Sequence, residues 1–256
     1  MRISVVVPTL NAERFLLSAL DSIAQQDFNN YEVILVDGGS TDRTIPIAKC
    51  YPHITIIHAP PRGEPNAINI GFKHATGDIL TWLDADDAYE LGCFVAVSEF
   101  FAGHTDVDWV YGKCHVIDEK GNGCRQWVTS MKEAFQKRYS YAGLLLGDFI
   151  AQPATFFRRI SFLGLAGLDE REKLAFDYDL WLRLGRAFGP PGYIDGYLAN
   201  WRAHKDSETA KDLVHDLKDG LRLSLKYSPR QYHLRPLQYG VFCLSLLGYF
   251  ASGALD

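Results

Sequence analysis

The chain has 256 residues, of which 47% are hydrophobic and 22% are charged, and its formal net charge is −5. This composition predicts a globular protein with a sizeable core and argues against a general nucleic-acid binder, so we expect no nucleic-acid partner. The five cysteines are scattered and form neither a disulfide framework nor close metal-binding pairs, which favours a reducing compartment.

Apolar runs alternate with helical patterns over the first hundred residues. Continuous apolar segments predict buried strands at 3–7, 32–36, 54–58 and 79–83. Apolar residues at helical spacing predict helices at 13–26, 41–50 and 66–75 and a fourth from about Glu90. Asn11 is a candidate N-cap for the first of these helices. The opening apolar run is short and ends at Pro8, so we expect no signal peptide. The alternation indicates an α/β sheet with right-handed crossovers.

Polar residues stand where three of these strands end. Thr9 and Asn11 follow the first strand, Asp37 follows the second, and an Asp84-Ala85-Asp86-Asp87 stretch follows the fourth. Ligands of such sheets bind beyond the carboxyl ends of the strands, so we expect these groups to converge on one crevice. Three carboxylates within four residues repel one another and favour a cation or hydrogen-bond donors. The alternative is a solvated turn that caps the next helix.

The second half of the chain lacks the regular alternation of strands and helices. Strand-like segments occur at 108–112, 115–118, 153–158 and 197–203, with a strong turn signal at 119–123. Helical patterns occupy 177–188 and about 208–227. No internal repeat or low-complexity linker separates the halves, so we expect one continuous domain.

Several motifs in their order along the chain resemble those of family 2 glycosyltransferases. The matching segments are 5–11, 33–42, 82–87, 152–159 and 176–183. The resemblance implies a GT-A fold, a Rossmann-like mixed sheet flanked by helices, over residues 1–205. Its nucleotide-sugar half would cover about 1–110 and its acceptor half about 111–205, with a C-terminal helical extension at 206–256.

The resemblance also implies an activity. An inverting, metal-dependent transferase would move a sugar from a UDP-sugar or related donor to a glycan or lipid-linked glycan acceptor. The expected setting is assembly of a cell-surface polysaccharide or glycolipid, in the cytoplasm or at the cytoplasmic face of the membrane. The alternatives are a catalytically inactive sugar-nucleotide binding module and a nucleotidyltransferase. The latter would release pyrophosphate, and its usual Gly-rich basic loop is missing near Pro8.

The acidic stretch after the fourth strand would organise the donor. Hard oxygen ligands suit Mn²⁺ or Mg²⁺, which offset the charge that builds on the departing diphosphate. By resemblance, Asp86 is the direct metal ligand and Asp84 contacts ribose or sugar hydroxyls. Ala85 belongs to the same binding stretch, and Asp87 would hold a water molecule or the donor sugar.

The remaining donor contacts come from the earlier loops. By resemblance, Asp37 accepts a hydrogen bond from the nucleotide base; the alternative is an Asx-turn or helix cap. The nucleoside pocket would be lined by Pro8, Thr9 and Asn11. Glu13 either joins this pocket or is a first-turn acid favoured by a helix dipole.

A short helix after Gly63 offers two further donor contacts. Asn66 and Asn69 would meet the diphosphate or ribose. Relatives carry an acid near Asn66, so the local contact is expected to differ in this chain.

Inversion needs a carboxylate that takes the proton of the acceptor hydroxyl. Asp177 shares a helical face with Leu180 and Trp181, whereas Asp179 shares a face with Arg183 that reads as solvated or ion-paired. Partial burial at a helix start raises the basicity of a carboxylate. We therefore predict Asp177 as the general base and Asp179 as a structural partner.

His204 follows the last predicted strand. A lone histidine is commonly structural, but the spacing of Arg202 and His204 resembles that of a GT-A histidine that completes the metal shell or meets the diphosphate. His204 is therefore the second candidate metal ligand.

The segment 237–255 contains no charged residue. Its length approaches the ~20 residues that span a bilayer, but Gln238 and three glycines weaken that signal. The expectations are a docked or homodimer-forming helix, or an interfacial helix in peripheral contact with a membrane.

Overall fold

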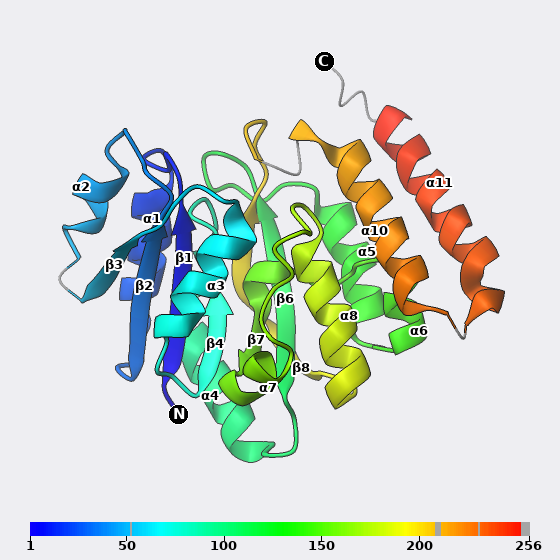
Figure 1. The fold of residues 1–256 in the computed structure, drawn as a ribbon, viewed down its shortest axis with the longest axis horizontal. Helices are drawn as coiled ribbons and strands as arrows, with labels where there is room; N and C mark the ends of the chain where they lie inside the picture. Colours follow the sequence, from blue (N-terminus) through cyan, green and yellow to red (C-terminus); the bar gives the residue numbers. More distant parts are fainter. Residues whose placement is uncertain (52, 208–210, 230, 252–256) are drawn as a thin grey trace.

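A computed structural model describes the whole chain except residues 52, 208–210, 230 and 252–256. An eight-stranded sheet runs through the molecule in the order β3-β2-β1-β4-β7-β6-β8-β5 (Figure 1). The parallel pairs are β1 with β2, β2 with β3, β1 with β4, and β6 with β8. Strand β7 is antiparallel to β4 and β6, and β5 is antiparallel to β8. The predicted mixed α/β sheet is confirmed.

The strands have the following bounds: β1 Ile3–Thr9, β2 Tyr31–Asp37, β3 Ile54–His58, β4 Ile79–Trp82, β5 Ala88–Tyr89, β6 Trp109–Ile117, β7 Thr155–Arg158 and β8 Gly192–Arg202. The α-helices are α1 Leu16–Ala24, α2 Thr44–Ala48, α3 Glu64–His74, α4 Cys93–Gly103, α5 Gln126–Gln136, α6 Tyr141–Leu144, α7 Arg159–Gly164, α8 Phe176–Phe188, α10 Leu213–Tyr227 and α11 Arg235–Ala251. Short 3-10 helices cover Gln152–Ala154 and Tyr232–Leu234.

Helices cover both faces of the sheet, so each face has its own apolar core. Alternate residues of β1 point to opposite faces, and Val6 packs with α3 and α8, whereas Val5 and Val7 pack with α1 and α4. All seven residues of β1 are buried. Gly71 of α3 lies so close to β1 that an added Cβ would come within 2.5 Å of Val6 Cγ1. The central position of β1 explains its unbroken β-branched run.

Most predicted elements are present, with three corrections at their ends. Helix α1 begins at Leu16 and its N-cap is Phe15, so Asn11 is not the N-cap. The two strand-like segments after Asp108 form one strand, β6, whose register with β8 shifts around Lys113. β8 begins five residues before Tyr197, the predicted start. The helices α5, α6 and α7 were not predicted.

The C-terminal helices lie beside the sheet at the end opposite β3 (Figure 1). Helix α11 packs along α10, and its buried Gln238 donates to the hydroxyls of Ser224 at 2.6 Å and Ser228 at 3.1 Å. Among the described residues, no helix combines the length and apolarity required to cross a membrane. The start of the predicted helix from Glu208 falls on residues outside the described part, and α10 begins at Leu213.

Candidate active site

The polar residues predicted to share a crevice lie at one edge of the sheet. Thr9 is paired with Asp37 across β1 and β2, and Val6 is paired with Trp82 across β1 and β4. The loops after β2, β1 and β4 are therefore neighbours. The turn after β4 is closed by the Asp87 N–H, which donates to the Asp84 carbonyl at 3.0 Å and so carries Ala85 at its tip.

The three carboxylates of this turn form one cluster. Asp84, Asp86 and Asp87 each offer an oxygen within 4.8 Å of the others. Asp87 is 1% exposed, and its Oδ1 accepts the Arg202 backbone N–H at 2.8 Å. Asp86 is the more accessible acid, with 29% of its side chain exposed. A fully solvated turn does not describe this cluster, because Asp87 is buried and Asp84 Oδ1 is enclosed.

His204 reaches the same cluster from the other half of the chain. Its Nε2 lies 2.7 Å from Asp86 Oδ2, and its side chain is 8% exposed. The His204 ring packs against Phe15, with 5.0 Å between the ring centroids. The sequence pattern had paired Asp86 and His204 as metal ligands, and the structure brings these two side chains together.

Burial and repulsion raise the pKa values of the enclosed acids. The pKa of Asp84 is well above its usual range because of burial, the charge of Glu64, a hydrogen bond with Glu64 and the charge of Asp86. The pKa of Asp87 is raised by burial and by the charges of Asp86 and Asp84, and Arg202 opposes this shift. A bound divalent cation would relieve both effects.

The donor atoms fit such a cation. Asp84 Oδ1 and Asp87 Oδ2 are buried without a hydrogen-bond partner in the described part of the chain. Carboxylate oxygens with one imidazole nitrogen suit Mn²⁺ or Mg²⁺, with the nitrogen favouring Mn²⁺. Asp86 and His204, which already lie together, would hold the ion.

The loop after β1 is tied to the loop after β2. Asn11 has a left-handed backbone with φ of 51°, its N–H donates to Ser40 Oγ at 2.9 Å, and its Oδ1 accepts from Thr41 N–H at 2.9 Å. Glu13 lies before α1 rather than in its first turn, and its Oε2 accepts the Arg43 N–H at 2.9 Å. These bonds fix the shape of the loops that follow Pro8 and Thr9.

Asp37 forms the Asx-turn that was the alternative to base recognition. Its carboxylate accepts the N–H of Gly39 at 3.2 Å and of Ser40 at 3.1 Å, and His58 Nδ1 lies 3.3 Å away. Burial raises its pKa, but these hydrogen bonds outweigh burial and lower it overall. Asp37 is 2% exposed, so its main visible role is to shape the loop, and base recognition stays a prediction.

The amides of α3 hold the segment before α8. Asn66 Nδ2 donates to Glu170 Oε2 at 2.9 Å, and Asn69 Nδ2 donates to the Leu168 carbonyl at 3.0 Å. Asn66 Oδ1 is buried and has no hydrogen-bond partner among the described residues. The donor contact predicted for Asn66 therefore rests on this one oxygen. The acid of this helix that interacts with Asp84 is Glu64, which was not predicted from the sequence.

Asp177 lies in the first turn of α8, one residue after its start. It is partly exposed, and its Oδ1 accepts the Tyr178 N–H at 2.7 Å. Its pKa is raised well above its usual range by burial, then by the charges of Asp148, Asp216 and Asp84. The charge of Asp84 contributes to this shift, and a raised pKa suits a general base.

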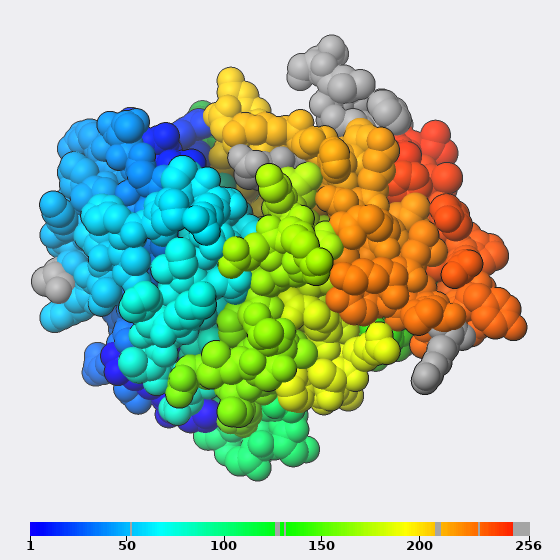
Figure 2. Space-filling model, viewed as in Figure 1, coloured from blue at the N-terminus to red at the C-terminus, as the bar shows by residue number. Residues whose placement is uncertain are grey.

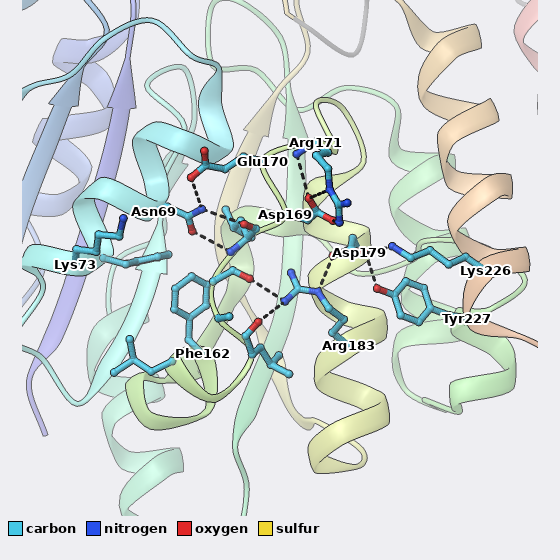
Figure 3. Close-up of a pocket in the computed structure, with 16 residues that line it drawn as sticks. Asn69, Lys73, Phe162, Asp169, Glu170, Arg171, Asp179, Arg183, Lys226 and Tyr227 are labelled. Carbon is cyan, nitrogen blue, oxygen red and sulfur yellow. Dashed lines mark hydrogen bonds and ion pairs between the residues drawn. The ribbon is translucent and has the colours of Figure 1, made fainter.

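Asp179 lies on the other side of α8, in the structural position predicted for it. It is buried, and its carboxylate accepts from Arg183 Nε at 2.6 Å and from Tyr227 Oη at 2.7 Å, with Lys226 Nζ at 3.4 Å. The predicted face is ion-paired but not solvated, because α10 covers it. Figure 3 shows this network at one wall of a cavity of about 710 Å³ that Asn69 also lines. In Figure 2 that face of the molecule is formed by α3, the segment before α8 and α10.

Two acids beside Asp177 were also missed from the sequence. Asp148 follows α6, and Asp216 lies in the first turn of α10. The pKa of Asp148 is raised to about 6 by burial, with Lys132 opposing the shift. The pKa of Asp216 is raised by burial and by Asp219. No local pattern marks either residue, since only the packing of separate helices brings them together.

Comparison with known proteins decides the family. The family model described as "Glycosyl transferase family 2" matches residues 4–162. The chain belongs to this family. This glycosyltransferase is also 34% identical over 201 residues to a "PGL/p-HBAD biosynthesis glycosyltransferase" of Mycobacterium tuberculosis, covering 76% of the chain and 73% of that relative. An uncharacterized glycosyltransferase of Rickettsia felis is 26% identical over 84% of the chain and 36% of its own length.

Solved structures establish the fold of this glycosyltransferase. S. aureus TarS 1-349 in complex with UDP-GlcNAc superposes with a TM-score of 0.69 at 20% identity, covering 98% of this chain and 73% of that one. The mannosyltransferase PcManGT from Pyrobaculum calidifontis, in complex with GDP-Man and Mn²⁺, superposes with a TM-score of 0.65 at 20% identity, covering 100% of this chain and 81% of that one. The predicted GT-A fold is confirmed.

Proposed function

We propose that this glycosyltransferase moves a sugar from a nucleotide diphosphate sugar, with UDP as the carrier, to an acceptor hydroxyl with inversion at the anomeric carbon. The observation that carries the proposal is the contact between Asp86 and His204 within an acid cluster in which Asp84 Oδ1 and Asp87 Oδ2 are buried without a hydrogen-bond partner among the described residues. The UDP-GlcNAc complex of TarS and the GDP-Man and Mn²⁺ complex of PcManGT support a nucleotide sugar and a cation in this fold.

The donor would lie across the ends of β1, β2 and β4. Pro8, Thr9 and Asn11 would line the nucleoside pocket, and Asp37 would meet the base from the turn that it holds. Asp84 would contact ribose or sugar hydroxyls through its free Oδ1, beside Ala85. Glu13 and Asn66 are the remaining residues that we propose to contact the nucleotide sugar.

Asp86 and His204 would hold Mn²⁺ or Mg²⁺. The ion would offset the negative charge that gathers on the diphosphate as the glycosidic bond breaks. Asp86 is suited to this role because 29% of its side chain is exposed, His204 contacts its carboxylate and Arg202 donates to its carbonyl.

Asp177 would act on the acceptor. A single displacement needs a base that takes the proton of the attacking hydroxyl on the side opposite the diphosphate. Asp177 stands on a different element from the metal ligands, yet within electrostatic reach of Asp84. Its raised pKa makes it a better proton acceptor than an ordinary aspartate.

The acceptor would be a glycan or a lipid-linked glycan used in cell-surface polysaccharide or glycolipid assembly in the cytoplasm. The name of the mycobacterial relative, a PGL/p-HBAD biosynthesis glycosyltransferase, supports an acceptor of this class. Helix α11 adds support, because Leu237, Leu244 and Leu247 are more than half exposed. Such a face suits peripheral contact with the cytoplasmic face of a membrane, or a homodimer.

Two measurements separate those two uses of α11. Flotation with anionic lipid vesicles would detect membrane contact, and light scattering after gel filtration would detect a dimer. The double variant Leu244→Asp, Leu247→Asp should abolish whichever association the wild type shows. A monomer that does not float would contradict both.

The activity is tested with a panel of sugar nucleotides in the presence of Mn²⁺. Thermal stabilisation would identify the donor, and NMR of the product would report the anomeric configuration. Release of nucleoside diphosphate supports a transferase, whereas pyrophosphate release would indicate a nucleotidyltransferase. Binding with no turnover, even by donor hydrolysis, would indicate an inactive binding module.

A further inference from the structure

Arg202 is a buried residue that forms hydrogen bonds to the turn of Asp84 to Asp87. It is the last residue of β8 and is 5% exposed. Its backbone N–H donates to Asp87 Oδ1 at 2.8 Å, and its Nε donates to the Asp86 carbonyl at 2.7 Å. One residue thus binds the turn at two consecutive acids, through its own main chain and its side chain.

The other end of the guanidinium is fixed by the turn after β6 and by α1 with its N-cap residue. Nη1 donates to the Asp118 carbonyl at 3.1 Å, at the end of β6, and Nη2 donates to Ser18 Oγ at 3.2 Å, in α1. The Arg202 Cζ lies 4.9 Å from the centroid of the Phe15 ring. These contacts hold the planar guanidinium group in one orientation, which a lysine could not match.

The same ring also packs against the proposed metal ligand. Phe15 lies between Arg202 and His204, at 4.9 Å from the Arg202 Cζ and 5.0 Å from the His204 ring centroid. Residues two apart on an extended segment point to the same side, so Arg202 and His204 approach the Asp86 turn together. Arg202 therefore fixes the main chain of Asp86, and His204 meets its side chain.

We propose that Arg202 is a positioning residue for the metal site, holding the Asp86 main chain so that its carboxylate and His204 meet at one ion. The inference rests on the proposed function, because it requires a divalent cation at Asp86. Without the guanidinium, the turn would lose the donor to its Asp86 carbonyl and, with it, the link to Asp118 and to Ser18 of α1. The turn would then relax outward, and the ligands would lose their common centre.

Arg158 provides a matched control. Its guanidinium donates to the carbonyls of Val107, Phe101 and His104 and lies 4.9 Å from the Phe101 ring. It therefore combines main-chain anchoring and aromatic packing as Arg202 does, but at the end of β7, opposite Ile79 at the start of β4 and so at the other end of that strand from the acid cluster. Losing it should cost stability without moving a metal ligand.

The test measures the binding of Mn²⁺ alone by electron paramagnetic resonance, which reports free Mn²⁺ directly. Arg202→Met should weaken Mn²⁺ binding by about tenfold or more, Arg202→Lys by less, and Arg158→Met by under twofold. Thermal unfolding of all three variants shows how much of any loss is structural. The Mn²⁺ spectrum of Arg202→Met should also broaden or change its splitting relative to the wild type.

A milder variant keeps the test decisive if Arg202→Met does not fold. Ser18→Ala removes only the hydrogen bond to Nη2 and should weaken Mn²⁺ binding about twofold to threefold. Equal Mn²⁺ affinity in the Arg202 and Arg158 variants, or in Ser18→Ala and the wild type, would overturn the inference while leaving the proposed function standing. A wild-type protein that binds no Mn²⁺ would overturn both.

Discussion

His204 Nε2 lies 2.7 Å from Asp86 Oδ2, although 118 residues separate them in the chain. The short strand β5 explains the meeting. It begins two residues after Asp86 and pairs with the end of β8, where Ala88 lies opposite Asn200. The turn after β4 and the segment after β8 are thereby fixed side by side, and the proposed metal site belongs to this sheet edge rather than to a flexible loop.

Removing either proposed ligand should weaken metal binding. Asp86→Ala should abolish both Mn²⁺ binding and Mn²⁺-dependent UDP binding, and His204→Ala should weaken Mn²⁺ binding by about tenfold. Isothermal titration with MnCl₂, with and without UDP, measures both. His104→Ala serves as the control, because this exposed histidine stacks on Phe100 away from the site. Unaltered Mn²⁺ affinity in Asp86→Ala would refute its assignment.

The centre of the sheet was predictable from the sequence because β1, β4 and most of β2 are buried on both faces. The β-branched run of β1 and the acids after β4 carry strong local signals, and parallel strands bring such ends to one edge. The extent of β8 was harder to see, since its first half, through Asp195 and Gly196, lacks an apolar run. Its pairing with β6, which ends next to the site, decides that extent.

The parts that were missed depend on contacts between distant elements. Glu64 looks like an ordinary first-turn acid, and only the packing of α3 against β1 brings it to Asp84. The helical phase of α8 separates Asp177 from Asp179, and the role of Asp177 as the base stays a prediction. Of the two alternatives for the face of Asp179, solvated or ion-paired, the structure has the ion-paired one, because α10 covers the charged face of α8.

Asp177→Asn should abolish transfer and leave donor binding intact. The amide cannot accept the proton, so we expect turnover to fall by about 10²- to 10⁴-fold, with Mn²⁺-dependent UDP affinity within about twofold of the wild type. Initial rates of UDP release and UDP titrations measure the two properties. Wild-type turnover would exclude Asp177 as the base. Loss of UDP affinity with loss of turnover would instead assign it to donor binding.

Asp179→Asn should act on stability. The substitution leaves Arg183 without its buried carboxylate partner, so the free energy of unfolding should fall by about 3–5 kcal/mol. Urea unfolding followed by tryptophan fluorescence measures the loss. Arg171→Ala is the control, because its ion pair with Asp169 places an 87% exposed arginine at the surface and should contribute at most about 1 kcal/mol. Equal losses in the two variants would contradict the structural role of Asp179.

Asp148 should control the pH range in which Asp177 works. The charges of Asp148, Asp216 and Asp84 raise the pKa of Asp177, whereas the N–H of the next residue, Tyr178, favours its charged form. The base must be deprotonated, so activity should rise with pH through its pKa. Asp148→Asn removes one negative neighbour and lowers the pKa of Asp177. The acid limb of the pH–rate profile should therefore move to lower pH, by about one unit.

The same substitution should change the pH dependence of stability. The pKa of Asp148 is about 6 in the folded protein, against an ordinary value of 3.8. A raised pKa favours folding below about pH 4, and this contribution is lost as pH rises through 6. Asp148→Asn should thus stabilise the protein by roughly 1–3 kcal/mol at pH 8 and have little effect at pH 4. Asp106→Asn, at an exposed turn, is the control. A pH–rate profile that keeps its acid limb, with stability equally changed at pH 4 and pH 8, would rule out electrostatic coupling between Asp148 and the base.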